Sequence, residues 1–590
     1  MFTMSMLDGR PTDTPAGRRR RPTRAGDRLR RRLAWILAAS LPLLLAHSVI
    51  PIDQFVHRGD DAYYYFQLAA TFPRLGFWSF DGIHPTNGVQ PLWALGLTGV
   101  ALVLSWFGVT DPNLLARVFV ACAALCHFGA SLLLFHLLSR TVSTATGLVA
   151  AGAFLFPMGI VWSRVWGMEN SLYALLLVAS LCQIHLVVLR RPAKRSAAAL
   201  GLLLGLTALA RLNAALLGPL ALAWVWWKLR AGPAGRRVVL TAALIALCVV
   251  APHFVWNLAS TGHVLPVSGV VKEIRSQAFL DARGVESRWS PAFAGALAEY
   301  RPAFKWFVTS RIVDSMWIGG SRLLLDGDSK LNWRWVVPLV SGLALAPLLV
   351  GRARRWARFL GGHAARVSAF GYVLAFAAGN VALSVFRYPS EVGYAMIRWW
   401  LVEGELVVVC VSATLVAACG VWMSRRIVPR RLRASALVTL VVLLVALHAQ
   451  QMVRFYWSGR IVRHDWKLSW NDELYAAARW LNEHTRPGER VGAWNAAILG
   501  YYRRGSVINL DGLANGFELV PYLRTGRIAD YIKAKDIRYL SDIETEFSSR
   551  HLERELRLTE VYSRYSEFMR RHYRIYRVER DEPPRPAAVR

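Results

Sequence analysis

The chain has 590 residues, of which 54% are hydrophobic, and a formal net charge of +33. This length and apolar content exclude a single soluble domain and indicate a polytopic membrane protein. Its lysines and arginines form short clusters between apolar runs. That distribution argues against a nucleic-acid partner and fits the positive-inside rule of membrane proteins.

The N-terminal segment, residues 1–32, holds ten arginines and no lysine. We expect a disordered cytoplasmic tail, followed by an uncleaved membrane anchor that begins at Leu33. The apolar runs lie at about 33–52, 91–107, 114–138, 145–163, 171–189, 197–228, 238–256, 335–350, 367–386, 401–422 and 435–450. The basic residues expected on the cytoplasmic side are Arg140 and the clusters at 190–195, 228–237, 352–358 and 425–433.

Two apolar runs decide the topology. The run 91–107 is barely long enough to span a bilayer, and a crossing there would place the next basic clusters outside, so we expect it to lie at the outer interface. The run 197–228 would form a helix of roughly 48 Å, so we expect a hairpin that turns outside near Arg211 and Asn213. The prediction is then eleven spans, with outer segments at 53–113, 257–334 and 387–400.

Residues 451–590 change character and are expected to form an extracytoplasmic α/β domain. The segment ELYAAARWLNEHT predicts an amphipathic helix, and RVGAWN, SVINLDG and DIRYLSDI predict short strands. Alternation of helix and strand is typical of an α/β fold. The predicted domains are therefore the N-terminal tail 1–32, a transmembrane domain 33–450 and this C-terminal domain.

Two adjacent carboxylates, Asp60 and Asp61, open the segment DDAYYYFQ in the first outer loop. Apolar residues at helical spacing follow them, which predicts an interfacial helix. One aspartate could cap that helix. A second one at a low-dielectric boundary needs another reason, and neighbouring carboxylates raise one another's pKa, as suits a general base.

The next part of this loop gathers polar side chains. The stretch GFWSFDGIHPTNGVQPLWAL contains Asp81, His84, Asn87 and Gln90 among glycines and prolines. Such a loop could bind sugar hydroxyls, or its polar residues could serve only to form turns.

Three arginines, Arg117, Arg211 and Arg398, fall near the outer face in this topology. A guanidinium there could bind a phosphate through paired hydrogen bonds. Alternatively, each arginine could snorkel to the interface or pair with a carboxylate such as Glu391 or Glu403.

A further acidic residue, Glu169, falls at an outer turn between two spans. It could bind a sugar hydroxyl or pair with Arg164.

The order of these features resembles the GT-C class of membrane glycosyltransferases, which includes protein O-mannosyltransferases, aminoarabinose transferases and arabinofuranosyltransferases that use polyprenyl-phosphate sugars. The resemblance covers residues 33–260, and DDAYYYFQ and HPTNGVQPLW are its specific parts. It implies that Asp60 or Asp61 is the catalytic base and that Arg117 contacts the lipid phosphate. Several members have Asp-Glu where this chain has Asp-Asp, and the α/β domain is not shared by the class, so the choice of base and the acceptor stay open.

The predicted activity is transfer of a hexose or pentose from a polyprenyl-phosphate donor to an envelope glycan, lipid or protein acceptor. The reaction would take place on the outer face of the plasma membrane, with inversion at the anomeric carbon. No metal ligands and no obligatory cofactor are expected, although a divalent metal is possible. The six cysteines lie within apolar runs and lack the spacing of a zinc or disulfide site.

Two other functions fit the composition less well. A lipid-carrier flippase or transporter should show repeated halves with broken helices at the midplane, and no repeat is evident. An assembly protein would use the membrane part only as an anchor, for which one span would suffice.

Overall fold

The computed structural model describes residues 59–156, 164–230, 232–298, 370–391, 466–566 and 570–579, together with parts of 31–56 and scattered positions at 161 and between 402 and 453. Arg398 lies outside the described residues, as do nearly all of the N-terminal tail, the outer segment beyond residue 298 and the basic cluster 352–358.

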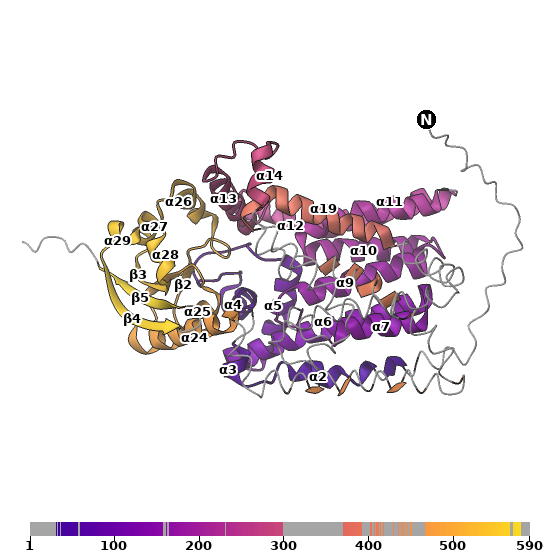
Figure 1. Cartoon of the computed structure of the whole chain (residues 1–590), viewed down its shortest axis with the longest axis horizontal. Coiled ribbons are helices and arrows are strands. Elements are labelled where there is room, and N and C mark those ends of the chain that lie inside the picture. Colours follow the sequence, from indigo (N-terminus) through magenta and orange to yellow (C-terminus); the bar gives the residue numbers. More distant parts are fainter. Residues whose placement is uncertain are drawn as a thin grey trace, which may run out of the picture.

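Long helices form one part of the molecule, and a small domain with a sheet covers one end of them (Figure 1). The described helices of the first part are α6 (Pro112–Thr141), α7 (Thr144–Leu155), α9 (Asn170–Cys182) with the π-helical η1 (Gln183–Val188), α10 (Lys194–Ala210), α11 (Leu217–Leu229), α12 (Pro233–Thr261) and α19 (Gly371–Arg387). Within the described residues, four stretches are long and apolar enough to cross a membrane: Pro112–Thr141, Asn170–Val188, Leu212–Leu229 and Pro233–Thr261. The prediction of eleven spans depends also on segments outside the described residues.

Local sequence explains how these helices begin and pack. Pro112 occupies the first turn of α6, and the Asp111 carboxylate accepts a hydrogen bond of 2.8 Å from the Leu114 amide. Helices α10 and α12 meet at Gly201 and Gly205. A Cβ added at Gly201 would lie 2.4 Å from the Ala242 carbonyl oxygen, and one added at Gly205 would lie 2.7 Å from the Cβ of Val249. Small residues four positions apart allow this close helix contact.

The anchor run 33–52 is interrupted. Its described positions between 31 and 38 are helical, a turn follows at Ala39 and Ser40, and α2 (Leu41–Ala46) and α3 (Ile52–Phe55) come next. Pro42 explains the interruption, because proline has no amide hydrogen to continue the hydrogen bonds of the preceding helix and is tolerated only in the first turn of a new one, here α2.

The break predicted within the run 197–228 is present, whereas the interfacial position predicted for the run 91–107 and the outer side of the turn stay predictions. The run 91–107 forms α5 (Pro91–Trp106), a shorter helix that stands across the direction of the long helices (Figure 1). The run 197–228 breaks at Arg211, whose backbone is extended, with φ −155° and ψ 108°. A short 3₁₀ helix, η2 (Leu212–Leu216), leads from there into α11.

The first part of the molecule also has shorter helices among its described residues. These are α4 (Ala62–Leu75), α13 (Val267–Asp281), α14 (Pro291–Ala298) and η4 (Pro389–Glu391). Helix α4 lies where the two parts of the molecule meet (Figure 1).

The C-terminal domain has a five-stranded sheet of order β2-β1-β3-β5-β4. Its elements are α24 (Trp466–His484), β1 (Arg490–Ala493), α25 (Ala497–Tyr502), β2 (Val507–Asn509), η6 (Phe517–Leu519), α26 (Val520–Thr525), α27 (Ile528–Ala534), β3 (Ile537–Ile543), α28 (Glu544–Ser548), α29 (Leu552–Glu555), β4 (Leu558–Ser566) and β5 (Arg571–Val578). Strand β1 pairs in parallel with β2 and β3, whereas β5 runs antiparallel to β3 and β4. The predicted α/β domain, with its first helix and three strands, is confirmed.

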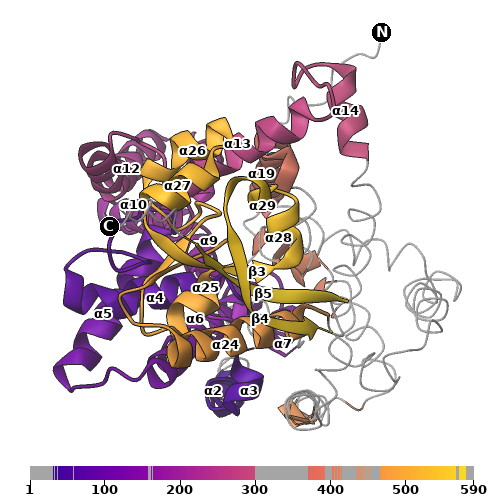
Figure 2. The same cartoon turned by 90° about the vertical axis from the view of Figure 1, so that its left-hand side faces the viewer.

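Helices cover both faces of this sheet, with α26 and α27 on one side and α24 and α25 on the other (Figure 2). The core on the α24 side is continuous with the core around α4, since Leu474, Val491 and Ile575 belong to the same buried cluster as Tyr63 and Phe66. The chain is thus a polytopic helical membrane protein whose C-terminal α/β domain is packed onto it.

Candidate active site

The aspartate pair lies where loops of the C-terminal domain reach helix α4. Parallel strands β1 and β2 end at Ala493 and Asn509, and the loops that follow them face this helix. The backbone amide of Ile498 donates a hydrogen bond of 3.0 Å to Oδ1 of Asp60. The side-chain amide of Asn509 donates one of 2.9 Å to the Tyr64 hydroxyl. The carboxyl ends of parallel strands are where open α/β sheets commonly bind ligands.

Helix capping does not explain either carboxylate. Asp61 immediately precedes α4, but its side chain makes no capping hydrogen bond. The amides of Ala62 and Tyr63 donate instead to the backbone carbonyls of Gly59 and Asp60, at 3.1 and 2.9 Å. The carboxylate of Asp60 turns toward Ile498 of the other domain.

The surroundings of Asp60 favour its protonated form. Burial is the largest cause, the neighbouring charge of Asp61 adds to it, and together they raise the pKa of Asp60 to about 8, against the opposing hydrogen bond from Ile498. The charges of Asp511 and Asp542 raise this pKa further. Asp60 is therefore mostly protonated near neutral pH.

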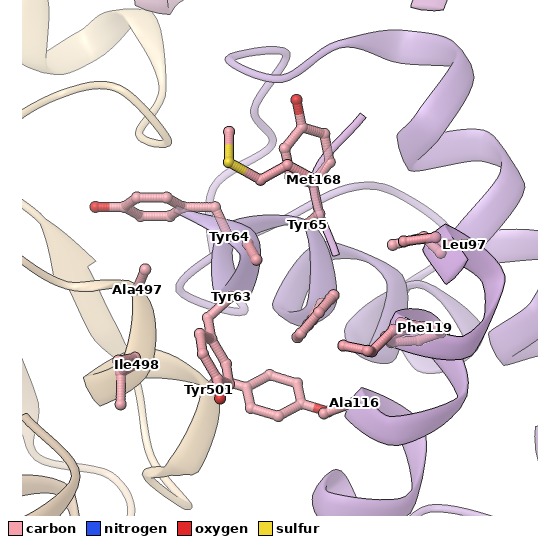
Figure 3. Packing of buried hydrophobic residues seen from close by; sticks show 14 of the residues in the cluster. Tyr63, Tyr64, Tyr65, Leu97, Ala116, Phe119, Met168, Ala497, Ile498 and Tyr501 are labelled. Carbon is pink, nitrogen blue, oxygen red and sulfur yellow. The ribbon is translucent and has the colours of Figure 1, made fainter. Parts of the chain in front are cut away.

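Three consecutive tyrosines of α4 connect the pair to its surroundings (Figure 3). Successive residues of a helix point about 100° apart, so each ring faces a different neighbour. The ring of Tyr63 packs against Tyr501, with centroids 5.4 Å apart. Tyr64 points to the C-terminal domain, and Tyr65 points away from it on the side of Met168.

Behind α4, Tyr65 reaches a buried ion pair. Its hydroxyl donates a hydrogen bond of 2.9 Å to Oε2 of Glu169, and Oε1 of Glu169 lies 3.8 Å from Nε of Arg211. Glu169 and Arg211 are 3% and 5% exposed. Gln90 closes the group, because its side-chain oxygen accepts a hydrogen bond of 2.9 Å from the Leu212 amide. Glu169 thus contacts Arg211 and Tyr65. The sequence had left open whether it pairs with Arg164 or binds a sugar hydroxyl.

Arg117 lies at the start of α6, as predicted. Its Nη1 donates hydrogen bonds to the carbonyls of Ser48 and Ile50, at 2.9 and 2.7 Å, and its guanidinium lies 5.1 Å from the centre of the Phe55 ring. This arginine therefore ties the end of the first anchor to α6.

His84 binds the C-terminal domain. Its Nδ1 lies 2.5 Å from the Asp81 carboxylate, and its Nε2 lies 3.0 Å from the carboxylate of Glu518. Lys535 completes the group with an ion pair of 2.6 Å to Glu518.

The buried side-chain amide of Asn87 makes hydrogen bonds through both its nitrogen and its oxygen. Its nitrogen donates to Asn257 at 3.2 Å, and its oxygen accepts from the Val267 amide at 3.0 Å. His84 and Asn87 thus fasten the outer loop, and their contact with a substrate stays a prediction.

The sequence did not identify Tyr64, Tyr65, Ile498, Asn509 and Asp511 as members of this site. A signal existed for some of them. Tyr65 follows Asp61 by one helical turn, and Asp511 lies near the end of the segment SVINLDG, which predicts a strand. Ile498 contributes only its backbone amide, which no residue type reveals.

Among the described residues, no three His, Cys, Asp or Glu side chains are close enough together to hold a metal ion. The expectation that no metal is obligatory stays a prediction.

Residues 462–579, which include the sheet domain, match a family model described as "Domain of unknown function (DUF8728)". No curated protein matches the chain.

Several solved structures are similar to the chain. One is the oligosaccharyltransferase AglB of Archaeoglobus fulgidus in complex with an inhibitory peptide and a dolichol-phosphate, at 15% identity over 91% of this chain and 74% of that one, with a TM-score of 0.43. The same archaeal enzyme in complex with Zn and sulfate matches at 14% identity over 86% and 68%, with a TM-score of 0.43. A third is ArnT from Cupriavidus metallidurans bound to undecaprenyl phosphate, at 12% identity over 91% and 97%, with a TM-score of 0.42. Both proteins are GT-C glycosyltransferases, the class that the sequence resembles.

Proposed function

We propose that this chain is a membrane glycosyltransferase that transfers a sugar from a polyprenyl-phosphate donor to a glycan, lipid or protein acceptor at the outer face of the plasma membrane. One observation carries the proposal: Asp60, with its pKa raised to about 8, stands beside a second carboxylate at the junction of the membrane part and the C-terminal domain. Acid pairs with shifted pKa values at such a junction are typical of catalytic sites.

Asp60 is the better candidate for the general base. A carboxylate with a pKa near 8 accepts the proton of an acceptor hydroxyl more readily than an ordinary aspartate does. About a tenth of such a group is ionised at pH 7, which suffices for slow transfer and increases with pH. Asp61 raises the pKa of Asp60 through its charge and lies beside it at the start of α4.

The reaction is a single displacement. The acceptor oxygen forms a bond to the anomeric carbon of the sugar and gives its proton to Asp60, while the bond from that carbon to the phosphate oxygen breaks. The electron pair leaves with the polyprenyl phosphate. Attack from the side opposite the leaving group inverts the anomeric configuration.

Arg211 is the best placed of the three arginines to receive the donor phosphate. It is buried, it lies at the break between α10 and α11, and its Nη1 has no hydrogen-bond partner among the described residues. Buried donors without partners are costly, and a phosphate oxygen would satisfy this one. Nη1 of Arg117 already donates hydrogen bonds to two backbone carbonyls. The role of Arg398 stays a prediction from the sequence.

The proposed topology places the N-terminus in the cytoplasm and the C-terminal domain outside. The clusters of basic residues support this orientation, because the described ones lie at helix ends. Arg140 is in the last turn of α6, the cluster 190–195 runs from just after η1 into the start of α10, and the cluster 228–237 runs from the end of α11 to the start of α12.

The test is complementation of a deletion strain. Asp60→Asn and Asp61→Asn should each abolish the change in envelope glycans that the wild-type gene restores, while the amount of protein in the membrane stays constant. Asp60→Asn keeps an oxygen that can accept the Ile498 hydrogen bond, so loss of function there reports on proton transfer. Asp281→Asn is the matched control, because Asp281 is exposed at the end of α13. Normal glycans with both site variants would exclude the proposal.

A further inference from the structure

We infer that Tyr65 and Glu169 form a positioning pair that keeps Arg211 open to the phosphate of the donor. The inference rests on the proposed function, because it assigns the phosphate to Arg211. It concerns residues that do not touch the reacting atoms and act only through this arginine.

The distance between Glu169 and Arg211 is the first step. At 3.8 Å from Nε to Oε1, the carboxylate is near enough to neutralise the guanidinium charge but too far for a hydrogen bond. Nη1 of Arg211 is likewise without a hydrogen-bond partner among the described residues. The arginine is thus charge-balanced while donors that would suit a phosphate stay unused.

The hydroxyl of Tyr65 explains why Glu169 does not move closer. It donates a hydrogen bond of 2.9 Å to Oε2 of Glu169 and accepts one of 3.1 Å from the Gln90 amide. A hydroxyl has a single hydrogen, and the bond accepted from Gln90 leaves that hydrogen directed at Glu169. Tyr65 therefore holds the carboxylate on the α4 side of the group.

The arginine is held from its other sides. Its guanidinium lies 5.7 Å from the centre of the Tyr173 ring, and the Leu212 amide next to it donates to Gln90. Gln90 thus contacts both Tyr65 and Leu212, at the break between helices α10 and α11. These contacts keep the distance between Glu169 and Arg211 fixed. Preorganised groups of this kind bind an incoming ion without a large cost of rearrangement.

Loss of the Tyr65 hydroxyl should then reduce phosphate binding through Glu169. Without its hydrogen-bond donor, the carboxylate would close onto Arg211 and compete with the phosphate. The same loss should be harmless where residue 169 carries no charge. This dependence separates a positioning role from a general contribution of Tyr65 to folding.

The experiment measures binding of undecaprenyl phosphate to the purified full-length protein in nanodiscs. Tyr65→Phe should weaken binding by about tenfold, the effect of one charged hydrogen bond. Glu169→Gln should bind at least as tightly as the wild type, and Tyr65→Phe combined with Glu169→Gln should bind within about twofold of Glu169→Gln alone. Tyr63→Phe, which removes another buried hydroxyl from α4, is the matched control and should bind like the wild type.

Two results would overturn the inference. One is wild-type affinity in Tyr65→Phe. The other is weaker binding in Glu169→Gln, which can be measured even if Tyr65→Phe does not fold. Arg211→Gln tests the proposed function separately: if it binds undecaprenyl phosphate as tightly as the wild type, the phosphate lies elsewhere, whatever Tyr65 does.

Discussion

The carboxylate of Asp60 accepts a hydrogen bond from the Ile498 amide in surroundings that disfavour its charge. The structure raises the pKa of this carboxyl group to about 8, mainly through burial and then through Asp61. A charge that the fold disfavours is also a reactive base, so stability and activity should depend on pH in opposite directions at this one residue.

Sugar transfer should increase with pH, because Asp60 must be ionised to accept a proton. We expect the rate at low substrate to rise about tenfold per pH unit well below a midpoint near 8, and to level off above it. The pH profile of transfer by the purified enzyme checks this. Asp60→Asn should have no such rise, and a wild-type rate that is flat from pH 6 to 9 would contradict the assignment of Asp60.

Thermal stability should fall over the same pH range. The pKa of Asp60 is about 8 in the folded state and near 3.8 in the unfolded chain, so the folded state binds more protons between these values. The stabilising effect of that proton is complete below about pH 4 and is lost as the pH rises through 8. Asp542 has a pKa raised to about 6, so changes above pH 7 report mainly on Asp60.

The matching measurement is the midpoint of thermal unfolding at pH 7 and pH 9. The midpoint of the wild type should fall more than that of Asp60→Asn, whose amide does not ionise. Equal changes in the two proteins would mean that Asp60 titrates normally.

The sequence predicts those helices and strands whose position follows from the local pattern of apolar and charged residues. The break at Arg211 follows from a span that is too long with a charge at its centre, and α5 follows from a run that is too short. Strands β4 and β5 were both missed. For β4 the reason is that most of its side chains are exposed and its pairing with β5 is irregular between Glu560 and Tyr562, so no alternation of apolar residues marks it.

The site is harder to predict than these elements, because its contacts join distant parts of the chain. Ile498 and Asp60 are separated by 438 residues, and Glu169 and Tyr65 by 104. The aspartates could be recognised from their own pairing. Their partners could not, since a backbone amide or the direction of a tyrosine ring depends on how the domains pack.

Packing of the outer loop onto the C-terminal domain should depend on Gly88. An added Cβ there would lie 1.8 Å from the Leu513 carbonyl oxygen, which belongs to the loop after β2. Gly88→Ala should therefore destabilise the protein by about 1–3 kcal/mol and make the C-terminal domain more sensitive to protease. Gly96→Ala in α5 is the control, because nothing lies within 4 Å of its added Cβ and alanine favours helix. Equal stability of the two variants would contradict the packing described for this loop.

For the whole molecule, the side of the membrane on which the C-terminal domain lies also fixes the side of the aspartates. Asp60 accepts a hydrogen bond from the Ile498 amide, and Thr86 of the outer loop donates one of 2.9 Å to the Asn515 carbonyl. Helix α4 and the sheet domain must therefore face the same compartment. A single measurement on the C-terminal domain therefore locates the proposed reaction.

Cysteine labelling in intact cells provides that measurement. Ser549→Cys places an exposed thiol after α28 in the C-terminal domain, and Ala193→Cys places one in the basic loop 190–195. A maleimide that does not cross the plasma membrane should label Ser549→Cys in intact cells and Ala193→Cys only after lysis, with the parent chain as the blank for native cysteines. The expected pattern follows from the positive-inside rule, because the loop 190–195 contains four basic residues and should be retained in the cytoplasm. The reverse pattern would place Asp60 in the cytoplasm and exclude transfer at the outer face.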